Sequence, residues 1–295
     1  MKIKHGSYAG DGTSSQVITT DIDADFVFVK GEEALVGWVK LSTMPATESF
    51  PWVTLGAQST VAITAIGATS FTVGTDLNNS VTYHWVAIEA EAGDSAVGTY
   101  TGNGSDNRNF AGVGFQPDMM MIIGPASDAI WWKTADMSAL YSQNLPSGRA
   151  PATDRIQALQ ADGFQVGTDN DVNQNTFPYY WFAVKNVAVR SKVVTWNGNA
   201  TDDRSITGVG FQPSFFTVST GTDGNTEGAA RFLNEIGDAS FRHGANDEAP
   251  NHIQAFEPDG VQVGDSAQVN NTGAYYAWAL AGSQPSQFSQ VNIIG

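Results

Sequence analysis

The sequence has 295 residues, of which 41% are apolar, 11% aromatic and only 15% charged, and its 31 glycines indicate a folded protein rich in turns and strands. Its formal charge of −16 argues against nucleic acid or an anionic membrane as a partner, because both would be repelled over most of the surface. It has no cysteine, which excludes disulfide bonds, thiol nucleophiles and Cys-ligated zinc.

The start of the chain predicts no export signal. Residues 1–12 contain two lysines but no apolar run of about seven residues, which a Sec signal requires. No apolar stretch reaches the length of about 18 residues that a membrane span needs. If the protein leaves the cell in which it is made, we expect release by lysis or by another route.

Five short patterns recur in the same order along the chain, and each predicts part of a repeated β unit. An aromatic-x-Gly turn comes first, and a buried strand follows it at residues 25–29, 118–123 and 214–218. An apolar pair comes next, then a short strand ending in Val-Gly, then a long aromatic strand. The first residues of these patterns are Tyr8, Tyr100 and Trp196 for the turn, Ile63, Ile156 and Ile253 for the pair, Phe71, Phe164 and Val261 for the short strand, and Tyr83, Tyr179 and Tyr275 for the aromatic strand.

The spacing of these patterns predicts an all-β protein made of three tandem β-sandwich or jelly-roll-like units. We expect a divergent first unit at 1–92, a second at 93–190 and a third at 191–283. Residues 284–295 repeat nothing and include Phe288, Val291, Ile293 and Ile294, so they are a possible docking strand for the third unit's sheet or for a neighbouring protein. The middle of each unit, for example 135–148, has room for a short helix.

The phrase GFQP precedes the buried strand in the second and third units. Pro117 and Pro213 cannot donate to a sheet ladder, so we expect them at the strand entrance. Gly114 and Gly210 permit unusual φ angles, and the phenylalanine that follows each of them can anchor in the core.

Two aromatic clusters are candidates for contact with a glycan or a partner. Trp131 and Trp132 form the better sugar platform, although core packing or a subunit contact is the favoured interpretation. The run 179–182 is interpreted as core plus a neighbouring interface, because a strand must point half of its side chains inward.

Asp169, Asp171 and Asn173 place oxygen ligands at alternate positions, as a calcium loop does. The loop lacks the glycine and the bidentate glutamate of that motif, so these residues are weak cation candidates and we expect no metal and no cofactor. Arg108 and Arg204 recur at equal offsets from the aromatic-x-Gly turn, where Gln16 stands in the first unit. The favoured interpretation is that each arginine binds a turn carbonyl or a carboxylate.

No catalytic motif is present. The four histidines share no pattern with a serine or a carboxylate, and neither a G-x-S-x-G nor an H-E-x-x-H motif occurs. With 30 Asp and Glu residues, a pair of carboxylates suited to glycoside hydrolysis remains an open alternative.

The second and third units, from Tyr100 to Val184 and from Trp196 to Leu280, resemble a tandem GFQPD-type repeat found in virion proteins of tailed bacteriophages, especially tail-fibre-like proteins. The resemblance implies a non-enzymatic structural role and a location in the virion, after synthesis in the host cytoplasm. The chain has no sign of a fibre shaft, which favours a capsid decoration or head-surface protein that packs against major capsid or other virion proteins. A tail-associated receptor- or glycan-binding protein is the main alternative, self-association is possible, and a glycan hydrolase comes third. Three similar units in one chain would also mimic a trimer at a threefold or quasi-threefold position.

Overall fold

The structure is a computed structural model that describes residues 1–53, 57–124, 130–145, 150–221, 226–244 and 248–286. It is all-β, as the sequence predicts, and its strands form six antiparallel sheets. One large and one small sheet come from each third of the chain. The described residues include no helix with the length and apolar character of a membrane span.

The first unit pairs a five-stranded sheet with a three-stranded one. The large sheet contains, in spatial order, β1 (Lys2–Ala9), β8 (Thr82–Glu89), β3 (Phe26–Gly31), β4 (Trp38–Leu41) and β5 (Phe50–Pro51). The small sheet contains β2 (Gln16–Thr19), β7 (Ser70–Val73) and β6 (Ile63–Gly67). A short 3-10 helix, η1 (Thr75–Leu77), precedes β8.

The second unit repeats this order of strands. Its large sheet contains β9 (Ser95–Thr101), β16 (Pro178–Val184), β11 (Met119–Ile123), β12 (Ile130–Thr134) and β13 (Gln143–Asn144). Its small sheet contains β10 (Arg108–Ala111), β15 (Gly163–Val166) and β14 (Ile156–Gln160). Residues 135–142 form turns, and the helix of this unit is instead α1 (Asn170–Asn173), which stands where η1 stands in the first unit.

The third unit has the same order with one added edge strand. Its large sheet contains β17 (Ser191–Asn199), β25 (Thr272–Leu280), β19 (Phe215–Thr220), β20 (Ala229–Phe232), β21 (Ser240–Arg242) and β22 (Glu248–Ala249). Its small sheet contains β18 (Arg204–Ile206), β24 (Gly260–Val263) and β23 (Ile253–Glu257).

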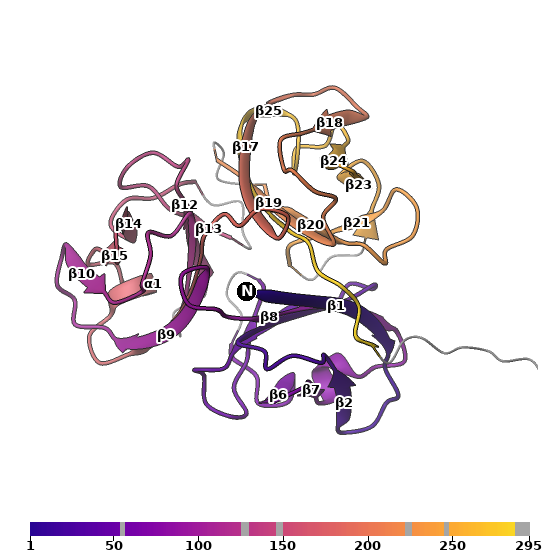
Figure 1. The fold of residues 1–295 in the computed structure, drawn as a ribbon, viewed down its shortest axis with the longest axis horizontal. Helices are drawn as coiled ribbons and strands as arrows, with labels where there is room; N and C mark the ends of the chain where they lie inside the picture. Colours follow the sequence, from indigo (N-terminus) through magenta and orange to yellow (C-terminus); the bar gives the residue numbers. More distant parts are fainter. Residues whose placement is uncertain (54–56, 125–129, 146–149, 222–225, 245–247, 287–295) are drawn as a thin grey trace, which may run out of the picture.

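The three large sheets surround a common centre, and the three small sheets lie outside them (Figure 1). This arrangement follows from the side-chain alternation of strands that are apolar on both faces. In β3, Val27 and Val29 join the core between the two sheets of the first unit, whereas Phe26 and Phe28 join a central core shared by all three units. Each unit therefore packs twice, once within its own sandwich and once around the centre.

Large side chains from different units meet in the central core. The ring centroids of Phe26, Phe182 and Trp278, one from each unit, lie 5.0 to 6.1 Å apart. His243 is fully buried there, where its Nε2 lies 2.9 Å from Thr217 Oγ1 and its Nδ1 lies 2.7 Å from the Leu145 carbonyl oxygen. Burial lowers the pKa of His243 to about 4, so its imidazole is neutral near pH 7.

The third unit also contacts the first through the end of β1. The backbone of Ser283 makes a parallel bridge with Lys4, and the His5 N–H donates to the Ser283 carbonyl at 3.2 Å. Ser286 donates through both its N–H and its hydroxyl to the Asp21 carboxylate. The predicted docking residues Phe288, Val291, Ile293 and Ile294 lie outside the described residues.

Candidate functional site

A buried cation occupies an equivalent position in every large sheet. Lys40 faces Val27 across β3 and β4, Lys133 faces Met120 across β11 and β12, and Arg231 faces Phe216 across β19 and β20. Each cation donates to backbone carbonyls of the loop that follows its own strand; Lys133 Nζ, for example, lies 3.1 Å from the Ser138 oxygen. Burial lowers the pKa of both lysines to about 8. These cations stabilise loops, because carbonyl oxygens satisfy their donors.

A buried asparagine plays a second repeated role. Asn78, Asn173 and Asn270 each donate to a carbonyl of the turn after the aromatic-x-Gly pattern and accept an N–H from the same turn. The predicted arginines complete this arrangement. Arg108 and Arg204 each donate to a turn carbonyl at 2.7 Å and also to the asparagine side chain. The interpretation of these arginines as turn-binding groups is confirmed, and in the first unit Gln16 Nε2 donates to the Ala9 carbonyl in their place.

The GFQP loops are bound by an aspartate from the Asp-Gly turn of the small sheet. The Asp162 carboxylate accepts from the N–H groups of Gly112 and Gly114, and Asp259 accepts from those of Gly208 and Gly210. All four glycines have φ between +84° and +90°, a region that L-residues with side chains rarely adopt. The repeated phrase is therefore a structural loop, and the backbone amides lower the pKa of Asp259.

Trp131 and Trp132 are core residues, as the favoured interpretation of the sequence had it, and they do not form the alternative sugar platform. Both side chains are buried, at 1% and 0% exposure, because successive residues of β12 point to opposite faces of a sheet that is covered on both sides. Trp131 packs inside the second sandwich under the Arg155 guanidinium, 4.0 Å from its ring centroid. Trp132 lies in the central core and donates to Ser219 Oγ of the third unit at 3.2 Å.

The aromatic run 179–182 is core plus interface, as interpreted from the sequence. Tyr179, Tyr180 and Phe182 are buried, and Tyr179 stacks on Tyr100 with the ring centroids 5.2 Å apart. Tyr180 packs against Phe50 of the first unit at 6.0 Å.

The weak cation candidates have protein partners. Asp169 caps α1 by accepting from the Asp171 N–H, and Arg155 forms ion pairs of 3.1 Å with both aspartates. Asn173 is the buried asparagine of the second unit. Within the described part of the chain, no three His, Asp or Glu side chains are grouped so that they could hold a metal ion.

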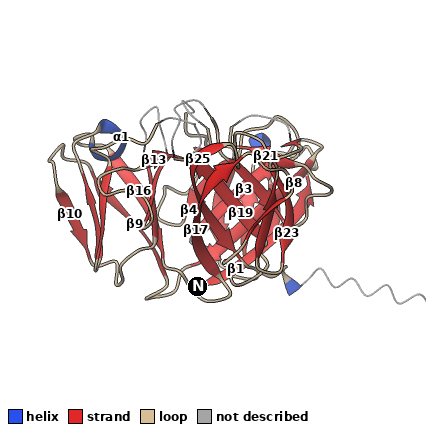
Figure 2. Cartoon of the chain, turned by 90° about the horizontal axis from the view of Figure 1, so that it is seen from above, coloured by secondary structure: helices blue, strands red, loops and turns tan. Residues whose placement is uncertain are grey.

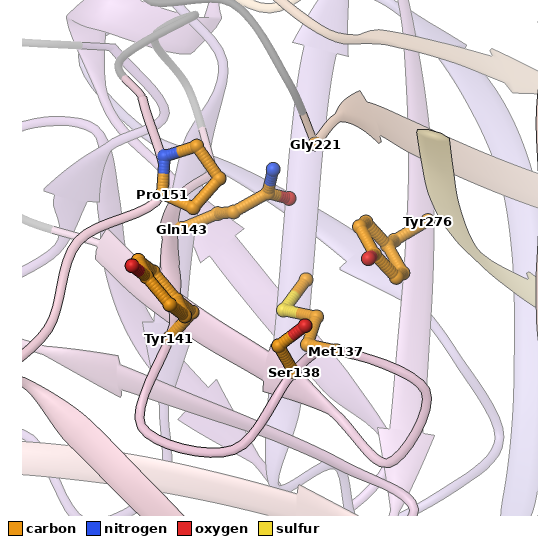
Figure 3. Close-up of a pocket in the computed structure, with 7 residues that line it drawn as sticks. All are labelled: Met137, Ser138, Tyr141, Gln143, Pro151, Gly221 and Tyr276. Atoms are coloured by element: carbon orange, nitrogen blue, oxygen red, sulfur yellow. The ribbon is translucent and has the colours of Figure 1, made fainter. Parts of the chain in front are cut away.

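A candidate binding pocket of about 180 Å³ lies between the second and third units (Figure 3). Tyr141 and Pro151 stand on one side of it, Tyr276 stands on the other, and Met137 and Ser138 lie between them. Gln143 and Gly221 complete the lining. The loop after β12, the first residue of β13 and Pro151 therefore supply one wall, and β25 with the end of β19 supplies the opposite wall.

A hydrogen-bond network fixes the inner wall of this pocket. The Gln143 side chain is 1% exposed; its Nε2 donates to the Thr220 carbonyl, and its Oε1 accepts from Ser219 Oγ at 2.7 Å. Because the same Ser219 accepts from Trp132, four residues join the two units below the pocket. Burial raises the pKa of Tyr276, and the nearby Asp136 charge adds to this shift, so the phenol is neutral near pH 7.

The equivalent interface between the third and first units contains titratable groups instead. The strand registers place Glu235 where Met137 stands, Glu248 where Pro151 stands and His84 where Tyr276 stands. His84 Nε2 lies 3.0 Å from Glu32 Oε1, and the imidazole stacks on Phe232 with centroids 5.6 Å apart. Burial lowers the pKa of His84, although Glu32 opposes this shift.

Glu235 is the unusual member of this group. Its side chain is buried, and neither carboxylate oxygen has a hydrogen-bond partner among the described residues. Burial holds the pKa of its carboxyl well above the ordinary value, and the charge of Glu248 adds to this, while Arg231 opposes it. The protonated, neutral form is therefore favoured over a wide pH range.

Comparison with known proteins gives one family match. Residues 33–147 match the model of a family described as a domain of unknown function (DUF7483). The segment begins after β3 and ends after β13, so it combines the second half of the first unit with the first half of the second. No curated protein matches the chain significantly. Since the family description assigns no activity, the geometry of the units carries the functional argument.

Sequence reasoning missed both interface sites. Tyr141 and Glu235 stand in no motif, and Tyr276 belongs to the repeated aromatic-strand pattern, which predicts a core strand. Some of the residues that lie beside these three come from another unit of the chain. One signal was available, because Glu235 replaces the methionines Met44 and Met137 four residues after the equivalent cations.

Proposed function

We propose that the protein is a non-enzymatic structural component of a bacteriophage virion, and that it decorates the capsid exterior by packing against other virion proteins. The observation that carries the proposal is the approximately threefold body that a single chain forms around one central core. Such a body presents similar faces at three positions, which suits a threefold or quasi-threefold point of a closed shell.

The repeated polar residues support a structural role. The equivalent lysines, asparagines and aspartates bind loop carbonyls and turn amides in every unit that carries them. These residues maintain the same loop shapes in the three units and do not form a set of reactive groups. A protein that acts by packing requires such shapes. The GFQP phrases that resemble virion repeats form the loops at the entrances of β11 and β19.

The net charge of −16 agrees with an exterior position. A protein present in many copies on a particle stays soluble when its surface is acidic, and it is repelled by packaged DNA.

The test is the copy number and position of the protein in purified particles, measured by quantitative mass spectrometry beside an electron-microscopy reconstruction. We expect hundreds of copies over the head, with density at threefold or quasi-threefold positions. A handful of copies at the tail would contradict decoration and favour host recognition. Absence from particles would overturn both versions. Sugar release by the purified protein, lost on changing particular carboxylates, would instead establish a glycan hydrolase.

A second experiment addresses the C-terminal segment. A chain that ends at Ser283 is added to particles that lack the protein, beside the full chain as control. Equal assembly of the two chains would exclude a docking role for residues 284–295.

A further inference from the structure

We propose that the pocket between the second and third units binds one neutral sugar ring, with Tyr141 and Tyr276 packing against it from the two sides. Sugar binding is a separate function from the proposed structural role. It does not depend on assembly into a virion, because it requires only that the pocket is accessible on the purified chain.

The size of the pocket limits the occupant. About 180 Å³ is smaller than the roughly 300–1,000 Å³ of pockets for drug-sized molecules. It suits a single ring, and the two tyrosines, Met137 and Pro151 supply apolar surfaces for the C–H faces of that ring.

Hydroxyl groups supply the polar contacts. Ser138, Tyr141 and Tyr276 line the pocket and each carries one hydroxyl, and none of these three hydroxyls bonds to another residue within the described ranges. A hydroxyl both donates and accepts, which matches the vicinal hydroxyls of a pyranose. The amide of Gln143 is already used by Ser219 and Thr220, so it shapes the wall and leaves recognition to the hydroxyls.

Charge selects a neutral sugar. The described lining residues carry no formal charge. The carboxylate of Asp136 is close enough to contribute to the raised pKa of Tyr276. An anionic sugar would meet this field and the overall charge of −16 without a cation in the pocket to pair with.

The equivalent positions at the other two interfaces are less suited to a neutral sugar ring. Between the first and second units, Phe50 stands at the position of Gln143 and packs against Tyr180, which stands at the position of Tyr276. Between the third and first units, His84 and Phe232 stack and carboxylates surround them. Ring packing at the first interface and charge at the second disfavour a neutral ring there.

The experiment titrates the purified full chain with methyl α-D-glucopyranoside, methyl β-D-galactopyranoside and N-acetyl-D-glucosamine, followed by saturation-transfer NMR and calorimetry. N-acetylneuraminic acid is the anionic comparison. We expect saturable one-to-one binding of at least one neutral probe, with a dissociation constant of about 1 mM, a value typical of a small ligand. Binding of the anionic probe should be at least tenfold weaker.

Three variants localise the binding. Tyr141→Ala removes an exposed ring, so the fold should survive while affinity falls at least tenfold. Tyr276→Phe keeps the ring and removes one hydroxyl, and a loss of severalfold is expected. Phe177→Ala removes an exposed aromatic outside the pocket and should bind like the parent chain. No saturable binding of any neutral probe, or full affinity in the folded Tyr141→Ala variant, would overturn the proposal. Neither result alters the copy number in particles, so failure here is distinguishable from failure of the virion role.

Discussion

Replacing Glu235 by methionine should stabilise the protein, although the substitution removes a carboxyl group next to Arg231. The carboxyl group is buried and neither oxygen has a partner among the described residues, whereas Met44 and Met137 fill the equivalent positions with apolar side chains. Leaving a buried polar group unsatisfied costs about 1–3 kcal/mol, so Glu235→Met should raise the free energy of unfolding by a similar amount near pH 7. At about 2–4 °C per kcal/mol, the melting temperature should rise by several degrees.

The pH dependence gives the sharper test. Because the pKa of Glu235 is higher in the folded chain than its ordinary value of 4.5, the unfolded chain releases this proton first as pH rises. The parent protein therefore loses stability as pH rises from about 4.5 toward the folded pKa, and the variant lacks this loss. The gain from Glu235→Met should therefore be smaller near pH 4 than near pH 7. Urea unfolding at several pH values between 4 and 8 measures it.

A matched variant reverses the comparison. Met137→Glu places the same carboxyl at the equivalent position of the second unit and should destabilise the protein increasingly as pH rises. If Glu235→Met gives no gain, or a gain that does not grow with pH, then the carboxyl has partners and the reasoning from burial fails.

Three further predictions concern the repeated polar residues. Asn270→Ala removes the acceptor of Arg204 and the donor to the Thr201 carbonyl and should cost about 1–3 kcal/mol in urea unfolding, whereas Asn271→Ala, at the exposed neighbour, should be nearly neutral. Lys133→Met removes the side-chain donor to the Ser138 and Tyr141 carbonyls and should cost about 1–3 kcal/mol. Lys133→Arg should cost less, because Arg231 performs this role in the third unit, and a larger cost for arginine would contradict the equivalence. Asp259→Ala should speed hydrogen exchange at the Gly208 and Gly210 amides and leave the Gly112 and Gly114 amides protected by Asp162. The pKa of Asp259 is lowered in the folded chain, so the parent loop should lose this protection as pH falls through that pKa, below the ordinary value of 3.8.

The sequence predicts the strands well because each repeated pattern has a local physical cause. Glycine at positive φ, proline at a strand entrance and the Asp-Gly turn specify loops wherever they occur. The first unit shows the limit of this reasoning. It lacks GFQP and the aspartate, yet it forms the same strands, because the N–H groups of Thr20 and Asp21 donate to the Thr69 carbonyl at the equivalent turn.

The face of the sheet to which each side chain points could not be predicted from the sequence. Runs such as 119–123 are apolar throughout, so alternation cannot tell which face meets the small sheet and which meets another unit. For the same reason the sequence favours core packing or a subunit contact for Trp131 and Trp132 without deciding which, and the central packing of three large sheets shows that both are covered. The pocket and the Glu235 group depend on that packing too.

A single chain that forms an approximately threefold body can vary each of its interfaces separately. In a homotrimer, any substitution appears three times, so a favourable residue at one interface is imposed on all. Here the equivalent position is Met44, Met137 or Glu235, and its neighbour across the interface is Tyr180, Tyr276 or His84. The proposed sugar site would therefore be occupied once per chain and not three times. A chain at the proposed threefold lattice point would have three distinguishable orientations.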